Sequence, residues 1–197
     1  MAFSFQNTSL QGLRLIAPFY AEDDRGFFLK TFEHDIFKRN GINTQGFELF
    51  FTRSARGTVR GLHFQRQDCQ DKLVQVLRGA AYDVAVDLRE GSGTFGQWEG
   101  FRLTAENRRM LYIPRGFAHG FLALEDDTLF SYLCGSRYDP ETDGGICWND
   151  SQLAVDWPLD HAGDPILSPK DAALPTLAEF LEQYGPLPGG GVQQCGS

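Results

Sequence analysis

A strictly alternating segment near the middle of the chain restricts the possible folds more than any other feature. Between residues 80 and 89, large apolar side chains alternate with small or acidic ones: Tyr82, Val84, Val86 and Leu88 against Ala81, Asp83, Ala85 and Asp87. A period of two residues is typical of a β-strand with two different faces. Residues 73–77 form a second apolar segment, and the Arg78-Gly79-Ala80 step between the two predicts a hairpin.

Further apolar segments recur at intervals of about ten residues, with turn-forming residues between them. The expected strands cover residues 12–16, 26–29, 58–65, 98–103, 109–113, 120–124 and 129–133. The chain also contains 22 glycines and 17 phenylalanines, which suits many turns around aromatic-rich strands. Together these observations predict an all-β sandwich or barrel.

Two segments have the period of a helix instead. Residues 32–40 predict a short helix that ends at Gly41. Near the C-terminus, Thr176 and Glu179 form a capping-box pattern at the start of an apolar stripe over residues 177–184. The predicted helices are therefore short and peripheral.

Length and charge narrow the class of protein. With 197 residues, the chain suits a single domain, expected over residues 1–185, with a flexible tail over residues 186–197. A net charge of −8 argues against a nucleic-acid binder. No apolar run is long enough to cross a membrane and no secretory signal is evident, so we expect a cytoplasmic protein with reduced cysteines.

The four histidines differ in their surroundings. His34 and His161 lie among polar residues and are expected at the surface. His63 lies in the apolar segment R-G-L-H-F-Q, where an imidazole needs a polar partner. His119 follows the turn P-R-G-F-A. His63 is therefore either a structural core histidine or a reactive one. His119 is either a loop histidine or a reactive one.

A metal site is the first hypothesis to weigh for two such histidines. Metal-binding cupins place H-x-H and a nearby Glu in one motif and a further His in a second. Here Gln65 replaces the second His, and the acidic position downstream is displaced by Lys72. Two histidines beside a cation do not make a usual ligand set, so we predict no metal and no cofactor.

A lysine near a histidine suits proton removal at a carbon beside a ketone. The resulting enolate is stabilised by a preorganised cation or donor, by roughly 3–4 kcal/mol for each. His63 is the natural base and Lys72 the natural cation. Epimerisation also needs an acid on the opposite face of the carbon. Tyr132 can supply it, although a tyrosine within an apolar strand is more often a core residue.

Four motifs occur in a fixed order: R-G-L-H-F-Q at 60–65, Y-I-P-R-G-F-A-H-G-F at 112–121, G-I-x-W-N-D at 145–150 and L-S-x-K-D at 167–171. Because all four motifs occur together in this order and at these separations, the chain resembles the dTDP-4-dehydrorhamnose 3,5-epimerase family over residues 8–177. The resemblance implies a cupin-type jelly roll without a cofactor. It also implies inversion of C3 and C5 of dTDP-4-dehydro-6-deoxy-D-glucose, which gives dTDP-4-dehydro-L-rhamnose.

The resemblance also assigns roles to residues. His63 matches the family's base, Asp171 the carboxylate that orients it, Tyr132 the acid, and Lys72 the lysine beside the C4 oxygen of the sugar. The family is dimeric, with an N-terminal strand that crosses to the partner, so Arg25 is expected to serve the neighbouring site. The expected substrate-binding residues are Arg25, Phe28, Glu48, Phe50, Arg60, His119, Tyr138 and Asp143.

One geometric condition follows. In a regular strand Arg60 and His63 would point to opposite faces. For both to reach one site, the strand must bulge or end near Gly61.

The chain departs from the family at several positions around these residues. It has Glu48-Leu49-Phe50-Phe51 where the family often reads Q-D-N-H, and Asp143 where Glu is common. Phe50 cannot form the hydrogen bonds of an amide. Lys30 also departs, and we hypothesise that Lys30 and Glu48 have exchanged the charges of the usual Glu/Gln pair.

These departures leave alternatives open. The chain can instead invert one carbon only, or act on another nucleotide-linked 4-keto-6-deoxy sugar. A cupin that binds a sugar nucleotide without catalysis is a further class, although binding does not need a base and an acid together. A metal-dependent cupin is disfavoured by Gln65 and Lys72.

Overall fold

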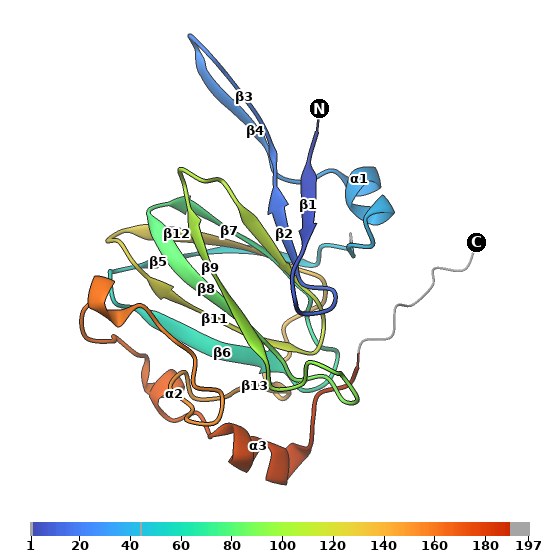
Figure 1. Cartoon of the computed structure of the whole chain (residues 1–197), viewed down its shortest axis with the longest axis vertical. Helices are drawn as coiled ribbons and strands as arrows, with labels where there is room; N and C mark the ends of the chain where they lie inside the picture. Colours follow the sequence, from blue (N-terminus) through green and yellow to red (C-terminus); the bar gives the residue numbers. More distant parts are fainter. Residues whose placement is uncertain (1, 44, 190–197) are drawn as a thin grey trace.

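Two antiparallel sheets face one another in the computed structural model, which describes residues 2–43 and 45–189 (Figure 1). The six-stranded sheet has the order β1-β2-β10-β7-β12-β5 and the five-stranded sheet the order β13-β6-β11-β8-β9. The predicted all-β sandwich of the jelly-roll type is confirmed. The six-stranded sheet contains β1 (Ser4–Asn7), β2 (Arg14–Ala17), β5 (Glu48–Ser54), β7 (Lys72–Arg78), β10 (Met110–Ile113) and β12 (Thr128–Cys134). The five-stranded sheet contains β6 (Val59–Gln65), β8 (Ala80–Asp87), β9 (Trp98–Thr104), β11 (Phe117–Ala123) and β13 (Asp143–Gly145).

The alternation in β8 separates two apolar clusters. Val84 and Val86 pack with Leu177 and Phe180 of the C-terminal helix, on the outer side of the five-stranded sheet. Residues on the other face, such as Ala85, pack between the two sheets with the large side chains of the opposite sheet. Both faces of β8 are therefore buried, because the C-terminal segment covers the face that would otherwise meet water.

The helices are short and lie outside the sandwich. They are α1 (His34–Arg39), α2 (Pro169–Ala172), α3 (Leu177–Tyr184) and one turn of 3₁₀ helix, η1 (Leu159–His161). The capping box of Thr176 and Glu179 forms at the start of α3, as predicted. Four strands (β1, β3 over Phe19–Asp23, β5 and β13), α2 and η1 were not expected from the sequence. Strands β1, β3 and β5 have mostly exposed or half-buried side chains, so they show no regular apolar alternation.

The predicted tail begins too early. Leu187 is 2% exposed, and its backbone N–H donates to Leu88 O at 2.8 Å. Glu90 N–H in turn donates to Leu187 O. Apolar burial and these two hydrogen bonds therefore hold residues 186–189 against the domain, and the rest of the predicted tail, 190–197, lies outside the described residues.

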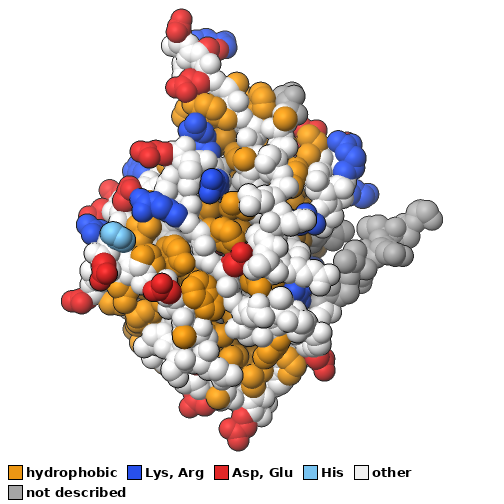
Figure 2. Space-filling view, viewed as in Figure 1, with side chains coloured by type: hydrophobic (Ala, Val, Ile, Leu, Met, Phe, Trp, Pro, Cys, Tyr) orange, Lys and Arg blue, Asp and Glu red, His pale blue; other side chains and the backbone are white. Residues whose placement is uncertain are grey.

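A two-stranded hairpin projects from the sandwich. It consists of β3 (Phe19–Asp23) and β4 (Gly26–Lys30), and it extends beyond the sheets at the top of Figure 1. Its tip carries charged side chains, visible at the same place in Figure 2. Phe27 and Phe28 on β4 are 67% and 57% exposed. Large exposed aromatic side chains on a projecting hairpin indicate an interaction surface for another protein or for a ligand.

A bulge in β6 satisfies the geometric condition set by the sequence. His63 lies opposite His119 on β11, and Arg60 lies opposite Phe121, so two residues of β6 face the single residue Gly120. Directly opposed residues of antiparallel strands share a face. Arg60 and His63 therefore both point between the sheets, and the predicted bulge near Gly61 is confirmed.

The bulge depends on close backbone contact. A Cβ atom on Gly120 would lie 2.7 Å from Arg60 O and 3.0 Å from the Cα of Gly61. We expect Gly120→Ala to lower the free energy of unfolding by about 1–3 kcal/mol in urea denaturation. Gly144→Ala is the matched control in the same sheet, because its Cβ would come no closer than 3.5 Å to Phe64. Equal losses in both variants would contradict this account of the bulge.

Candidate active site

Polar side chains from both sheets meet in the interior at one end of the sandwich. On the five-stranded sheet, His63 and His119 lie side by side on β6 and β11. On the facing sheet, Lys72 of β7 lies opposite Cys134, which lies opposite Glu48. The next row of that sheet contains Val74, Tyr132 and Phe50. The two sheets therefore bring histidines and a lysine with a tyrosine to one place.

His63 forms a pair with Asp171. Its Nε2 donates to Asp171 Oδ1, because a carboxylate can only accept. Asp171 lies in α2, where its backbone N–H donates to the capping Ser168 Oγ at 3.0 Å. Burial alone would raise the pKa of the Asp171 carboxyl, but the hydrogen bond and charge of His63 outweigh it and lower that pKa below its usual value. The carboxylate thus stays ionised and fixes the ring, which leaves Nδ1 of His63 free for chemistry.

Lys72 reaches from one sheet to the other. Its Nζ donates to His63 O at 3.4 Å. Burial lowers the pKa of the Lys72 ammonium, and nearby acidic groups oppose that shift only in part. The Lys72 ammonium thus lies close to the backbone of the His63 strand. A cation in this position is placed to stabilise an oxyanion that forms beside His63.

A second buried pair joins His119 to Asp83 of β8. Their Nε2 and Oδ2 atoms are 2.8 Å apart, and the side chains are 3% and 0% exposed. Burial lowers the pKa of the His119 imidazole, and the charge of Asp83 acts against that shift. Asp83 Oδ1 has no hydrogen-bond partner within the described part of the chain.

Aromatic rings surround the Tyr132 side chain, which is 8% exposed. Phe50 stacks on it with ring centroids 4.7 Å apart and planes 15° apart. Phe130 and His119 pack at 4.9 and 5.9 Å. Burial raises the pKa of the Tyr132 phenol, the charge of Asp83 adds to this, and Thr52 and Arg60 act against it. The phenol therefore keeps its proton at neutral pH.

A group of polar contacts lies at the end of β13. Tyr138 OH donates to Asp143 Oδ2 at 3.0 Å, and Lys170 forms an ion pair with the same carboxylate. Glu48 Oε1 accepts from the backbone N–H of Tyr138 at 2.8 Å. Lys30 instead forms an ion pair with Glu33. The two charges of the hypothesised Lys30–Glu48 exchange therefore have separate partners in the described structure: Lys30 pairs within its own segment, and Glu48 accepts from the distant Tyr138.

The expected phosphate-binding arginines are separated. Arg60 Nε donates to Ser54 Oγ at 3.2 Å, beside Tyr132. Arg25 is on the projecting hairpin, where its side chain is 89% exposed and pairs with Asp23. The structure thus brings Arg60 to the His63 site and leaves Arg25, with Phe28, away from the site of its own chain (Figure 1).

Four polar side chains of the site were not singled out from the sequence: Thr52, Ser54, Asp83 and Lys170. Asp83 carried a signal, since an acidic residue in the middle of an apolar strand needs a buried partner. Thr52 and Ser54 lie on β5, which was not recognised as a strand. Gln65, which stands where metal-binding cupins have His, uses its amide on backbone groups of Asp68, Arg137 and Asp139. Within residues 2–43 and 45–189, no three His, Cys, Asp or Glu side chains could hold one metal ion.

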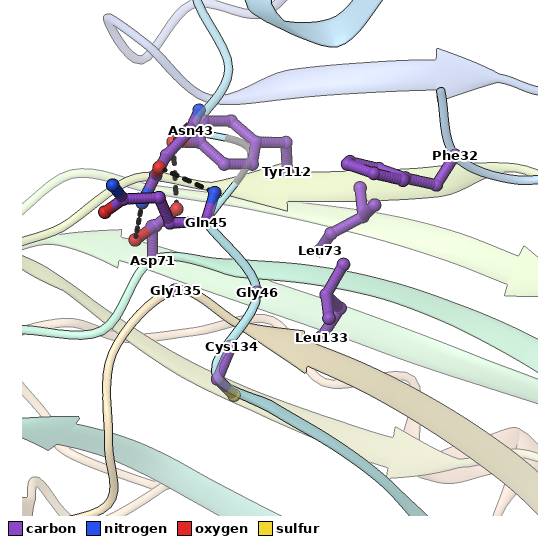
Figure 3. A pocket seen from close by; sticks show the side chains of 10 residues that line it. All are labelled: Phe32, Asn43, Gln45, Gly46, Asp71, Leu73, Tyr112, Leu133, Cys134 and Gly135. Atoms are coloured by element: carbon purple, nitrogen blue, oxygen red, sulfur yellow. Dashed lines mark hydrogen bonds between the residues drawn. The ribbon is translucent and has the colours of Figure 1, made fainter. Parts of the chain in front are cut away.

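A small pocket lies apart from His63 and Tyr132. Figure 3 shows Asp71 at its wall, where the carboxylate accepts from Asn43 Nδ2 at 3.1 Å and from Tyr112 OH at 3.3 Å. Arg115 Nε donates to the same carboxylate at 3.4 Å. Asn43 ties the segment before β5 to this carboxylate, and its backbone N–H also donates to Tyr112 OH at 3.4 Å. These contacts fix that segment, which indicates a structural role for this pocket.

Comparison with known proteins gives a consistent family. Residues 7–179 match the family model described as dTDP-4-dehydrorhamnose 3,5-epimerase. The chain is 49% identical over 177 residues to the dTDP-4-dehydrorhamnose 3,5-epimerase of Methanothermobacter thermautotrophicus, covering 90% of this chain and 96% of that protein.

Solved structures agree. An epimerase from Legionella pneumophila, in complex with dTDP-4-keto-L-rhamnose, has a TM-score of 0.89 and 43% identity and covers 95% of this chain and 98% of its own. A 3′-monoepimerase from Streptomyces bikiniensis, in complex with dTDP-quinovose, has a TM-score of 0.84 and 35% identity, with 92% and 91% covered. No helix in the described part of this chain is long and apolar enough to span a membrane.

The His63–Asp171 pair predicts a pH-dependent stability. Because the pKa of Asp171 is lower in the folded chain than in the unfolded one, its contribution is full above about pH 4 and is lost as the pH falls through the folded value. Asp171→Asn should therefore lower the free energy of unfolding at pH 7 by roughly 1–3 kcal/mol. Urea unfolding at a series of pH values measures this difference. The difference in the free energy of unfolding between wild type and Asp171→Asn should shrink below about pH 4. A difference that grows on acidification would contradict a stabilising His63–Asp171 pair.

Proposed function

The chain belongs to the dTDP-4-dehydrorhamnose 3,5-epimerase family, and we propose that it converts dTDP-4-dehydro-6-deoxy-D-glucose into dTDP-4-dehydro-L-rhamnose by inverting C3 and C5. It is an enzyme of the isomerase class, as the sequence motifs predicted. The observation that carries the proposed mechanism is the position of His63 and Tyr132, which lie on the interior faces of opposite sheets.

Proton removal falls to His63. Since Nε2 donates to Asp171, Nδ1 takes the proton from the carbon beside the ketone, and the imidazolium formed is stabilised by the carboxylate. The electron pair of the broken C–H bond moves to the C4 oxygen and forms an enolate. Lys72, held beside His63, stabilises the negative charge on that oxygen.

Proton delivery falls to Tyr132. Its phenol lies on the sheet opposite His63 and keeps its proton because it is buried. Donation to the carbon from this side inverts the centre, and the electron pair of the enolate forms the new C–H bond. The phenolate left behind is stabilised by Arg60, and solvent then returns a proton to Tyr132 and takes one from His63.

The nucleotide end of the substrate would extend toward Arg60, Tyr138 and Asp143. An arginine side chain suits the diphosphate because its fork matches phosphate oxygens. Tyr138 is 53% exposed and offers a ring for stacking. His119 and Glu48 would line the sugar end of the same interior, with the half-exposed Phe50 at its rim.

A homodimer would complete the site. Arg25 and Phe28 are mostly exposed on a projecting hairpin and contact only residues of that hairpin among the described ones, and a second copy would receive them beside its own Arg60. We propose the cytoplasm as the compartment, since the described cysteines, Cys69, Cys134 and Cys147, are free thiols.

Proton NMR of dTDP-4-dehydro-6-deoxy-D-glucose in deuterated water tests the reaction. The wild-type protein should introduce deuterium at both C3 and C5. His63→Ala and Lys72→Ala should each slow this exchange by about 10²–10⁴-fold while dTDP still binds. Tyr132→Phe should allow exchange but impair inversion.

His34→Ala is the matched control, because His34 is exposed and pairs only with its neighbour Asp35. Normal turnover by His63→Ala would refute the mechanism. Exchange at one carbon alone would identify a mono-epimerase, and binding without exchange a non-catalytic cupin.

Mixing two inactive variants tests the shared site. Arg25→Ala and His63→Ala should each be inactive alone, but a mixed dimer contains one site with both residues intact. Random mixing at equal amounts should restore about a quarter of the wild-type activity. The measurement is turnover after the two proteins are unfolded and refolded together. No restoration, with a dimer seen by light scattering, would place Arg25 outside the partner's site.

A further inference from the structure

Strand β5 carries an aromatic side chain, Phe50, to which the proton transfers described above assign no step. Phe50 stacks on Tyr132, while Thr52 and Ser54 follow on the same face of the strand. Phe51, the next residue, points to the other side of the sheet, opposite Ser131. Two adjacent phenylalanines therefore lie on opposite faces of the sheet, and only Phe50 lies on the face of Tyr132.

The three rings around Tyr132 differ in exposure. Phe130 and His119 are 0% and 3% exposed and belong to the core, so they support the ring from within. Phe50 is 41% exposed and covers the ring from the open side. It is thus the part of this contact that can be removed without a cavity in the core.

We propose that Phe50 is a positioning residue, which holds the Tyr132 ring in line for proton delivery. The inference rests on the proposed function, in which Tyr132 is the acid. Nearly parallel rings at 4.7 Å resist rotation of the Tyr132 side chain away from the interior. A phenol displaced by a fraction of an ångström delivers its proton poorly, because such transfers need close alignment.

The alignment of Tyr132 decides the fate of the enolate. When the phenol delivers its proton, the carbon inverts. When it does not, His63 returns a proton from the original side, and after exchange with solvent this proton is a deuteron. The carbon then gains deuterium with its configuration retained. Phe50 therefore governs the ratio of inversion to retained exchange, while removal of the first proton does not depend on it.

Phe50→Asn tests this directly. We expect inversion to fall roughly two- to tenfold, the range for loss of one aromatic pair, while total deuterium uptake and dTDP affinity stay unchanged. Phe50→Tyr, which keeps a stacking ring, should restore the wild-type ratio. Phe51→Asn, on the opposite face of the same strand, should leave the ratio unchanged. Light scattering checks that all variants keep the wild-type assembly.

A second measurement needs no substrate. In protein labelled with fluorotyrosine, the Tyr132 resonance, assigned with Tyr132→Phe, should shift in Phe50→Asn but not in Phe51→Asn. An unchanged resonance, an equal fall of exchange and inversion, or a loss of dTDP affinity without a change of ratio would overturn the role of Phe50. Absence of exchange in the wild-type protein would instead overturn the proposed function, and the fluorine spectrum would still report the contact.

Discussion

The close contact between Gly61 and Gly120 is the constraint on which the site depends. The two backbones approach so closely that neither position has room for a Cβ atom. This contact forms the bulge of β6, and the bulge turns Arg60 to the same side as His63. Without it, one of the two side chains would point into the outer apolar cluster. The proposed base and the proposed phosphate-binding group would then lie on opposite sides of the sheet.

The interior of this sandwich holds charges that most β-sandwiches exclude. Their desolvation is offset by pairing: Asp171 with His63, and Asp83 with His119. Each carboxylate ties up one ring nitrogen and leaves the other free. Lys72 adds a cation beside these pairs, so the interior can accept a negative charge that appears during a reaction. Tyr132 stays protonated because its burial, with the charge of Asp83 added, outweighs the opposing effects of Thr52 and Arg60 on its pKa.

The projecting hairpin and strand β5 have complementary roles. The hairpin extends two side chains, Arg25 and Phe28, away from the domain, so a single chain lacks them at its own site. Strand β5 instead belongs to the same chain as the site and lines it with Phe50, Thr52 and Ser54. Phe50 is where this wall meets solvent, which gives a position that can change the course of the reaction without disturbing the core. Specificity within this fold can therefore vary at the rim while the buried pairs remain the same.

The sequence by itself determined the alternation of β8, the all-β class and the capping box of α3, because these are local patterns of side-chain type. Its motifs also supplied the residues proposed to carry the chemistry. It required β6 to bulge or end near Gly61, since Arg60 and His63 could not otherwise share a site. Tertiary structure alone decided the partners: Asp83 for His119, Ser54 for Arg60, Glu33 rather than Glu48 for Lys30, and Phe50 for Tyr132. It also decided that Leu187 packs on the domain rather than in a tail. The physical reason is that pairing across strands depends on register and on the facing sheet, which bring together residues far apart in the chain and leave no trace in local spacing.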